Sequence, residues 1–78
     1  MIEKVKIVSF LNALAESIEM PENSISEDTK LEDIAWDSLA IISCIAISDE
    51  LFNVMLSGDE LANVSTIKDI ISLISKKI

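Results

Sequence analysis

The 78-residue chain has no histidine and no arginine, and it contains one cysteine, one glycine and one proline. The lone Cys44 cannot form a disulfide within the chain, and it is typical of a reduced intracellular thiol. Without histidine, the chain cannot build a Cys/His zinc site or a Ser-His-Asp or Cys-His catalytic device. The scarcity of glycine and proline also removes most of the turns that β-hairpins need. These absences argue against an enzyme and favour a helical fold.

Positive charge is scarce as well. Six lysines face 14 acidic residues, which gives a net charge of −8. Such a chain lacks the cations for phosphate contacts with nucleic acid, and anionic membrane surfaces repel it. The longest nearly apolar run, residues 39–47, is too short to span a bilayer, and the N-terminus shows no secretory signal. We therefore expect a cytoplasmic monomer that binds neither nucleic acid nor membranes and whose protein partners carry basic patches.

Apolar residues make up 50% of the chain, and their spacing predicts helices. The first helix is expected from Ile2 to about Ile18 and to end before Pro21. Its expected core stripe repeats at steps of three and four residues: Val5, Val8, Leu11, Leu14, Ala15 and Ile18.

A long polar loop is expected from Glu22 to about Ala35, with Ile25, Leu31 and Ile34 as apolar anchors. Thr29 and Glu32 have the spacing of a capping box, which predicts one short turn within the loop. Connections of this length between helices are often functional.

Three further helices follow. Asp37 is a good N-cap for a helix that runs to about Phe52. The capping box of Ser57-Gly58-Asp59-Glu60 opens a short third helix that ends at Asn63, and Thr66-Ile67-Lys68-Asp69 opens the fourth. The expected core stripe of the fourth helix is Ile67, Ile70, Ile71, Ile74 and Ile78. The sequence thus predicts an all-α fold, a small four-helix bundle with three longer helices, in which residues 1–78 form a single domain.

The tripeptide Asp37-Ser38-Leu39 lies where the long loop meets the second helix. Taken alone, it is ordinary chemistry for the start of a helix. A serine at the first helical position nevertheless exposes its hydroxyl beside free backbone N–H groups and the positive end of the helix dipole. A phosphodiester at this position is therefore electrostatically tolerated.

At this motif the chain resembles the acyl carrier protein family. The resemblance covers nearly the whole length, including the order of helices, Phe52 fourteen residues after Ser38, and the Val64-Ser65-Thr66-Ile67 entry to the last helix. It implies that a phosphopantetheinyl transferase attaches phosphopantetheine to Ser38, and that Asp37 caps the helix and helps to present this serine. The thiol of the arm then carries an acyl group as a thioester between loading and accepting enzymes, and the protein itself catalyses nothing.

The sequence departs from the family pattern at three places. Ala35 replaces the usual glycine two residues before the aspartate, which is costly if the backbone is left-handed there. Trp36 is either a loop aromatic packed on the bundle or a contact beside the prosthetic group. The second helix usually carries several acids, but residues 40–48 contain no charge.

A helix that is apolar nearly all round is either buried or covered by something apolar. The resemblance implies that some of its side chains line a space for the acyl chain. Others form an exposed patch for a partner, or the apolar residues only close the core. The expected partner contacts are Trp36, Leu39, Ile41, Ile47, Asp49 and Glu50.

Cys44 is interpreted as a small buried hydrophobe. Eight acids from Glu16 to Asp37 include no calcium-loop pattern, so we expect no metal site and leave weak divalent binding open.

Two alternatives to an acyl carrier remain from the sequence. An aminoacyl or peptidyl carrier has a similar bundle, although Asp37 directly before the serine favours the acyl type. A helical interaction module that never bears a cofactor is the other alternative. The sequence does not distinguish fatty acid, polyketide and related biosynthetic pathways.

Overall fold

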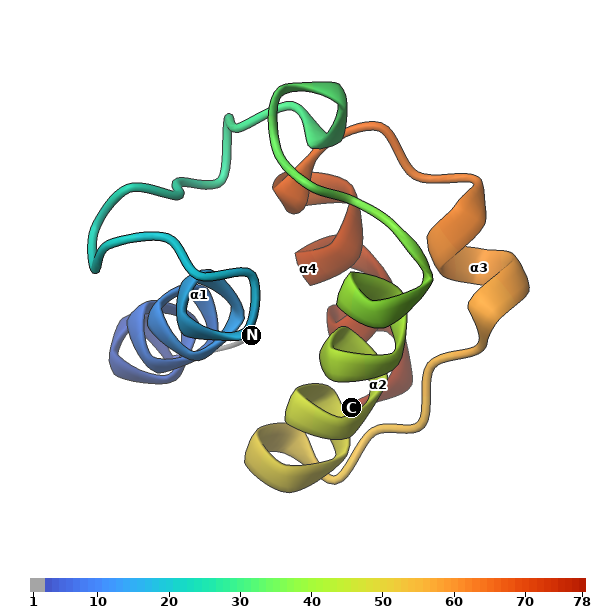
Figure 1. The fold of residues 1–78 in the computed structure, drawn as a ribbon. Helices are drawn as coiled ribbons and strands as arrows, with labels where there is room; N and C mark the ends of the chain where they lie inside the picture. The colour runs from blue at the N-terminus through green and yellow to red at the C-terminus, as the bar shows by residue number, and fades with distance from the viewer. Residues whose placement is uncertain (1–2) are drawn as a thin grey trace.

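Four α-helices and one short 3₁₀ helix form the regular structure of residues 3–78, the part of the chain that this computed structural model describes (Figure 1). The bounds are α1 Lys4–Ser17, η1 Leu31–Asp33, α2 Ser38–Phe52, α3 Gly58–Ala62 and α4 Ile67–Lys77. The prediction of a small all-α bundle is confirmed, with η1 as the short turn expected in the long loop. Ile2, the expected start of the first helix, lies outside the described residues.

The predicted core stripe of α1 is wrong in its first half. Val5 is 74% exposed and Val8 is 42% exposed, whereas Phe10 is fully buried. Ile7 and Leu11 pack beside the buried Phe10, Leu14 and Ala15. Both stripes repeat at steps of three and four residues, so spacing alone does not separate them. The ring of Phe10 packs 6.0 Å from that of Phe52 between centroids, and this contact between helices determines the face that is buried.

Backbone hydrogen bonds hold the long loop against the start of α4. The Leu31 N–H donates to the Ser65 carbonyl at 2.9 Å, and the Ile67 N–H donates to the Thr29 carbonyl at 3.1 Å. The Lys68 N–H donates to the backbone carbonyl of Glu27, two residues before Thr29 in the loop, at 2.8 Å. The loop is therefore part of the packed structure, and it fixes the approach to α2.

The expected anchors of the loop are confirmed, but its capping box is not. Ile25 and Leu31 are buried, and Ile34 is half-buried. The Thr29 hydroxyl accepts the Ser26 N–H at 2.9 Å, and η1 begins without a side-chain cap. Thr29 therefore closes a turn with residues before it and does not cap the residues after it.

The two predicted capping boxes are both present. The Ser57 N–H donates to the Glu60 carboxylate at 3.0 Å, and the Glu60 N–H donates to the Ser57 hydroxyl at 3.1 Å. Thr66 and Asp69 make the same reciprocal pair at the start of α4. Both carboxyls have a pKa below the usual value, because backbone N–H groups donate to them. Glu60 accepts from Ser57, and Asp69 accepts from Ser65 and Thr66.

Isoleucines of α4 fill the centre of the core. Four of the five expected residues are buried: Ile67, Ile70, Ile71 and Ile74. Ile78 is 68% exposed, so its assignment to the core was wrong. It lies beyond the last helical residue, Lys77, where the helical spacing no longer fixes the direction of the side chain.

Candidate functional site

The start of α2 presents Ser38 at the surface. Asp37 is extended, and its Oδ1 accepts the N–H of Ala40 at 3.0 Å, as expected for an N-cap. Ser38 is the first residue of the helix, and it is exposed. The hydroxyl that the sequence singled out is thus accessible at a helix N-terminus whose cap is supplied by its neighbour.

Ala35 does not strain the turn before α2. The residues with positive φ in the described part of the chain are Glu19, Asn23 and Asn53. Because Ala35 is not among them, the alanine costs nothing relative to the glycine that is usual in the family.

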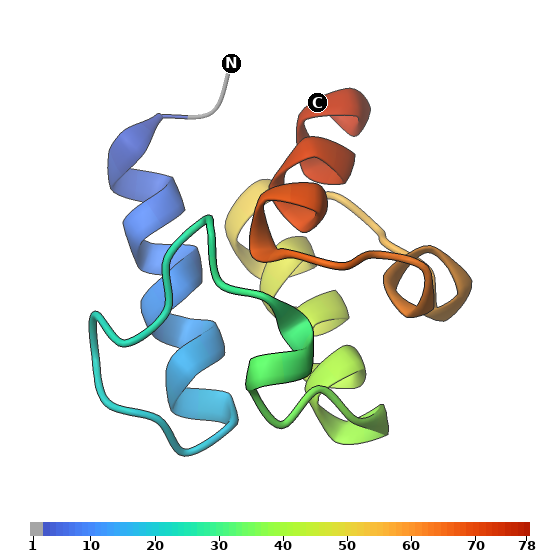
Figure 2. The ribbon, with the colours of Figure 1, turned by 90° about the horizontal axis from the view of Figure 1, so that it is seen from above.

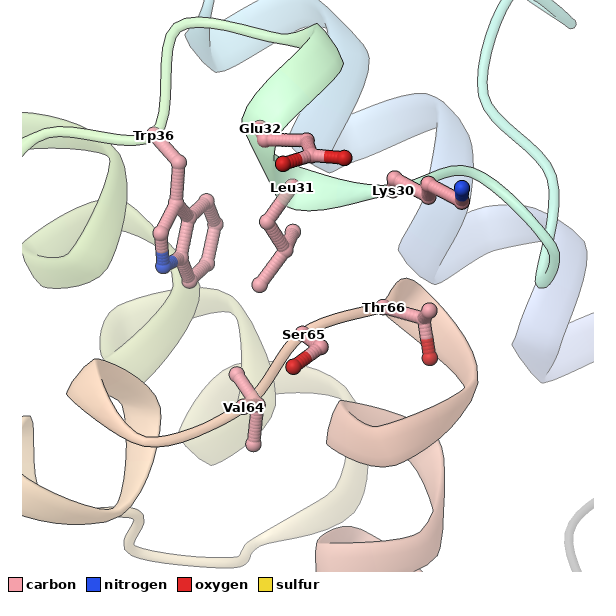
Figure 3. Close-up of a pocket in the computed structure, with 7 residues that line it drawn as sticks. All are labelled: Lys30, Leu31, Glu32, Trp36, Val64, Ser65 and Thr66. Atoms are coloured by element: carbon pink, nitrogen blue, oxygen red, sulfur yellow. The ribbon is translucent and has the colours of Figure 1, made fainter.

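Trp36 joins the long loop to α3. Its side chain is half-buried, and its indole N–H donates to the carbonyl of Leu61 at 3.3 Å. Its ring also faces a hollow of about 490 Å³ between η1 and the connection from α3 to α4, lined by Lys30, Leu31, Glu32, Trp36, Val64, Ser65 and Thr66 (Figure 3). Trp36 therefore packs on the bundle and also leaves part of its surface open two residues before Ser38.

The faces of α2 differ in exposure, and three groups of its uncharged residues can be distinguished. Ala40, Cys44 and Ser48 are buried. Ile41, Ile45 and Ile47 are half-buried and pack against the core. Leu39, Ile42 and Ala46 form an exposed stripe, with Leu39 at 74% and Ile42 at 61% exposure. We call these three residues the outer stripe of α2.

The structure divides the expected partner contacts in the same way. Leu39, Asp49 and Glu50 are exposed, whereas Trp36, Ile41 and Ile47 are half-buried. Ile42 is more exposed than either of the two expected isoleucines, and the sequence prediction omitted it. The spacing of Leu39, Ile42 and Ala46 at three and four residues is the signal that identifies this face.

Cys44 and Ser48 are one turn apart on the buried face of α2. Burial raises the pKa of the Cys44 thiol from 9.0 to about 12, although the nearby Ser48 hydroxyl opposes this rise. Ser48 Oγ is fully buried, and no partner among the described residues meets hydrogen-bond geometry with it. The thiol is thus a buried hydrophobic group, as the sequence suggested, and it takes no part in chemistry at the surface.

We expect the Cys44 thiol to be unreactive in the folded protein. At pH 9 an ordinary thiol is half ionised, but a thiol with a pKa of about 12 remains protonated and is also inaccessible. A thiol-specific chromogenic reagent should therefore react slowly with native protein up to pH 9 and rapidly after addition of denaturant. Fast reaction of native protein at pH 8 would show that this face of α2 opens.

Two kinds of feature are absent from residues 3–78. No three potential metal-ligating side chains gather there in a way that could hold an ion. None of the helices found in this part of the chain has the length and apolar character to cross a membrane.

Comparisons with known proteins agree with one another. The family model described as "Phosphopantetheine attachment site" matches residues 9–74. The "Acyl carrier protein homolog" of Mycoplasmopsis pulmonis is 31% identical over 58 residues, covering 74% of this chain and 80% of the relative. The "Acyl carrier protein" of Thermotoga maritima is 30% identical over 66 residues, covering 83% of this chain and 82% of the relative.

The fold also matches a solved structure. A crystal structure of an acyl carrier protein from Thermotoga maritima at 2.00 Å resolution superimposes with a TM-score of 0.74 at 20% sequence identity. The match covers 95% of this chain and 87% of the other. It supports the arrangement of the helices independently of the sequence motifs.

Proposed function

This chain belongs to the acyl carrier protein family, whose members carry a phosphopantetheine group and are not enzymes, and we propose that Ser38 is its attachment site. We propose further that residues 1–78 act as one carrier domain, which presents acyl intermediates to enzymes of fatty acid, polyketide or related biosynthesis.

The observation that carries this proposal is the position of Ser38. It is the exposed first residue of α2, and the cap of this helix depends on Asp37 and not on the serine itself. The free N–H groups and the dipole of the helix N-terminus favour a phosphodiester on the Ser38 hydroxyl. Once attached, phosphopantetheine supplies a thiol that holds an acyl group as a thioester.

The direct experiment is to incubate the purified protein with coenzyme A and a phosphopantetheinyl transferase. We expect its intact mass to rise by one phosphopantetheine group. A helical module that bears no cofactor would keep its original mass. The same measurement on protein from its own cell would identify the cargo, and an aminoacyl group in place of an acyl group would revise its class.

We propose that the outer stripe of α2 supplies apolar contact to partner enzymes. Leu39 and Ile42 are large and exposed, and no charged residue lies between Ala40 and Ser48. Asp37, Asp49 and Glu50 then set orientation from the two ends of the helix. Ile41 and Ile47 contribute their exposed edges, but truncating them would also disturb the core against which they pack.

We expect Ile42→Ser to impair acyl transfer with the cognate partner more than Glu50→Gln does. Truncating an apolar anchor at an interface costs about 2 kcal/mol or more, whereas an exposed charge pair contributes about 1 kcal/mol or less. The measurement is kcat/KM of transfer, with circular dichroism confirming that both variants fold. A larger loss for Glu50→Gln would indicate that charge dominates recognition along α2.

A further inference from the structure

A hollow of about 310 Å³ lies between the end of α1 and the start of α2. Asp37 and Leu39, the two neighbours of Ser38 in the chain, both line it. Its full lining is Ser17, Ile18, Glu19, Ala35, Asp37, Leu39 and Ala40. The hollow therefore combines apolar walls with two carboxylates, and it adjoins Ser38.

The carboxylates around this hollow are not neutralised within the described part of the chain. Glu19 also borders a second hollow on the α1 side, together with Glu16 and Glu22, and no lysine lines either hollow. The ion pair found among residues 3–78 joins Lys77 to Glu60, which line neither hollow. The surface on this side of Ser38 thus carries unpaired negative charge beside exposed apolar side chains.

A partner that acts on Ser38 has to approach the end of the molecule where α1 ends and α2 begins (Figure 2). The stretch of α2 after Ser38 offers apolar contact but no charge until Asp49. Two acids line the hollow beside Ser38: Asp37, next to it in the chain, and Glu19, at the end of α1. Glu22, in the loop that follows α1, lines the neighbouring hollow together with Glu19. This arrangement favours a partner surface that is both apolar and basic.

Building on the attachment site proposed above, we propose that this hollow is the docking surface for enzymes that act at Ser38. An apolar side chain of the partner enters the hollow against Ile18 and Leu39. Flanking lysines or arginines of the partner pair with Glu19, Glu22 and Asp37. Charge recognition by these enzymes therefore takes place on the α1 side of Ser38. Leu39 belongs to both surfaces, and Ile42 and Ala46 of the outer stripe continue the apolar contact along α2.

The test is the rate at which the phosphopantetheinyl transferase of the same cell modifies the full chain, measured by intact mass at low salt. The variant Glu19→Gln/Glu22→Gln should lower kcat/KM by about tenfold, because opposite charges raise association rates by roughly ten- to a thousandfold. Added salt should lower kcat/KM of the unmodified sequence and bring it close to that of the variant.

A matched control is available in the same loop. Glu27→Gln/Asp28→Asn removes the same number of charges from exposed residues that line neither hollow, and it should leave kcat/KM within about twofold. The apolar contact is tested with Leu39→Ser. This variant should lower kcat/KM by about tenfold or more, because a few apolar anchors supply most of the binding energy of an interface. Met55→Ser is the control, because Met55 is 65% exposed but does not line the hollow, and it should leave kcat/KM unchanged.

Each other outcome overturns the proposal. If the two double variants lose kcat/KM equally, the effect is one of net charge in general. If Glu19→Gln/Glu22→Gln loses no kcat/KM, recognition takes place elsewhere. A concentration-dependent dimer of the chain that this variant abolishes would assign the hollow to a second copy. If the unmodified sequence gains no phosphopantetheine at all, the proposed attachment fails, and the docking proposal fails with it.

Discussion

Ser38→Ala is expected to remain completely unmodified when it is incubated with coenzyme A and a phosphopantetheinyl transferase. The substitution removes the hydroxyl oxygen to which the phosphate is joined, and no neighbouring side chain can replace it. The fold should not change, because Asp37 Oδ1 caps α2 by accepting the Ala40 N–H and because residue 38 is exposed. The melting temperature should therefore stay close to that of the original protein.

Ser43→Ala is the matched control, since Ser43 is another serine of α2 but is half-buried and away from the helix start. It should be modified to the same extent as the original sequence. Modification of Ser38→Ala, or loss of modification in Ser43→Ala, would assign the arm to another residue.

Phe10→Ala is expected to destabilise the folded protein strongly. Phe10 is fully buried and packs against Phe52, with the ring centroids 6.0 Å apart. Truncation of a buried phenylalanine costs about 3–5 kcal/mol. A domain of this kind has only about 5–15 kcal/mol of stability, so much of the protein should unfold at moderate urea concentrations.

Val5→Ala provides the comparison on the same helix. Val5 belonged to the core stripe expected from the sequence, but it is 74% exposed. Its truncation should change the free energy of unfolding by about 0.5 kcal/mol or less, as surface substitutions usually do. Equal losses for the two variants in urea denaturation would show that α1 is rotated relative to this structure.

The features that could be predicted from sequence are those determined by neighbouring residues. The caps at Asp37, Ser57 and Thr66 each depend on residues three positions apart, and all three form as expected. The exposed position of Ser38 at the start of α2 follows from the first of these caps.

Two misses are local, namely the capping box at Thr29, whose hydroxyl accepts the nearby Ser26 N–H, and Ile78, which lies beyond the end of α4. The other features that the sequence missed depend on contacts between distant segments. The rotation of α1 is set by the packing of Phe10 on Phe52, and the path of the long loop is set by hydrogen bonds to the start of α4. The indole of Trp36 finds its acceptor in Leu61, 25 residues away. The hollow beside Ser38 likewise needs the end of α1 to meet the start of α2, which no local pattern reveals.

The most direct measurement of the central claim is the mass of the peptide that contains Ser38, taken from protein purified from its own cell. Trypsin cleaves after Lys30 and Lys68 and releases residues 31–68 as one peptide. We predict that this peptide carries phosphopantetheine, and that fragmentation places it on Ser38 with an acyl thioester that hydroxylamine removes. An unmodified peptide, or a group located on another serine such as Ser43 or Ser57, would contradict the assignment of Ser38 as the carrier site.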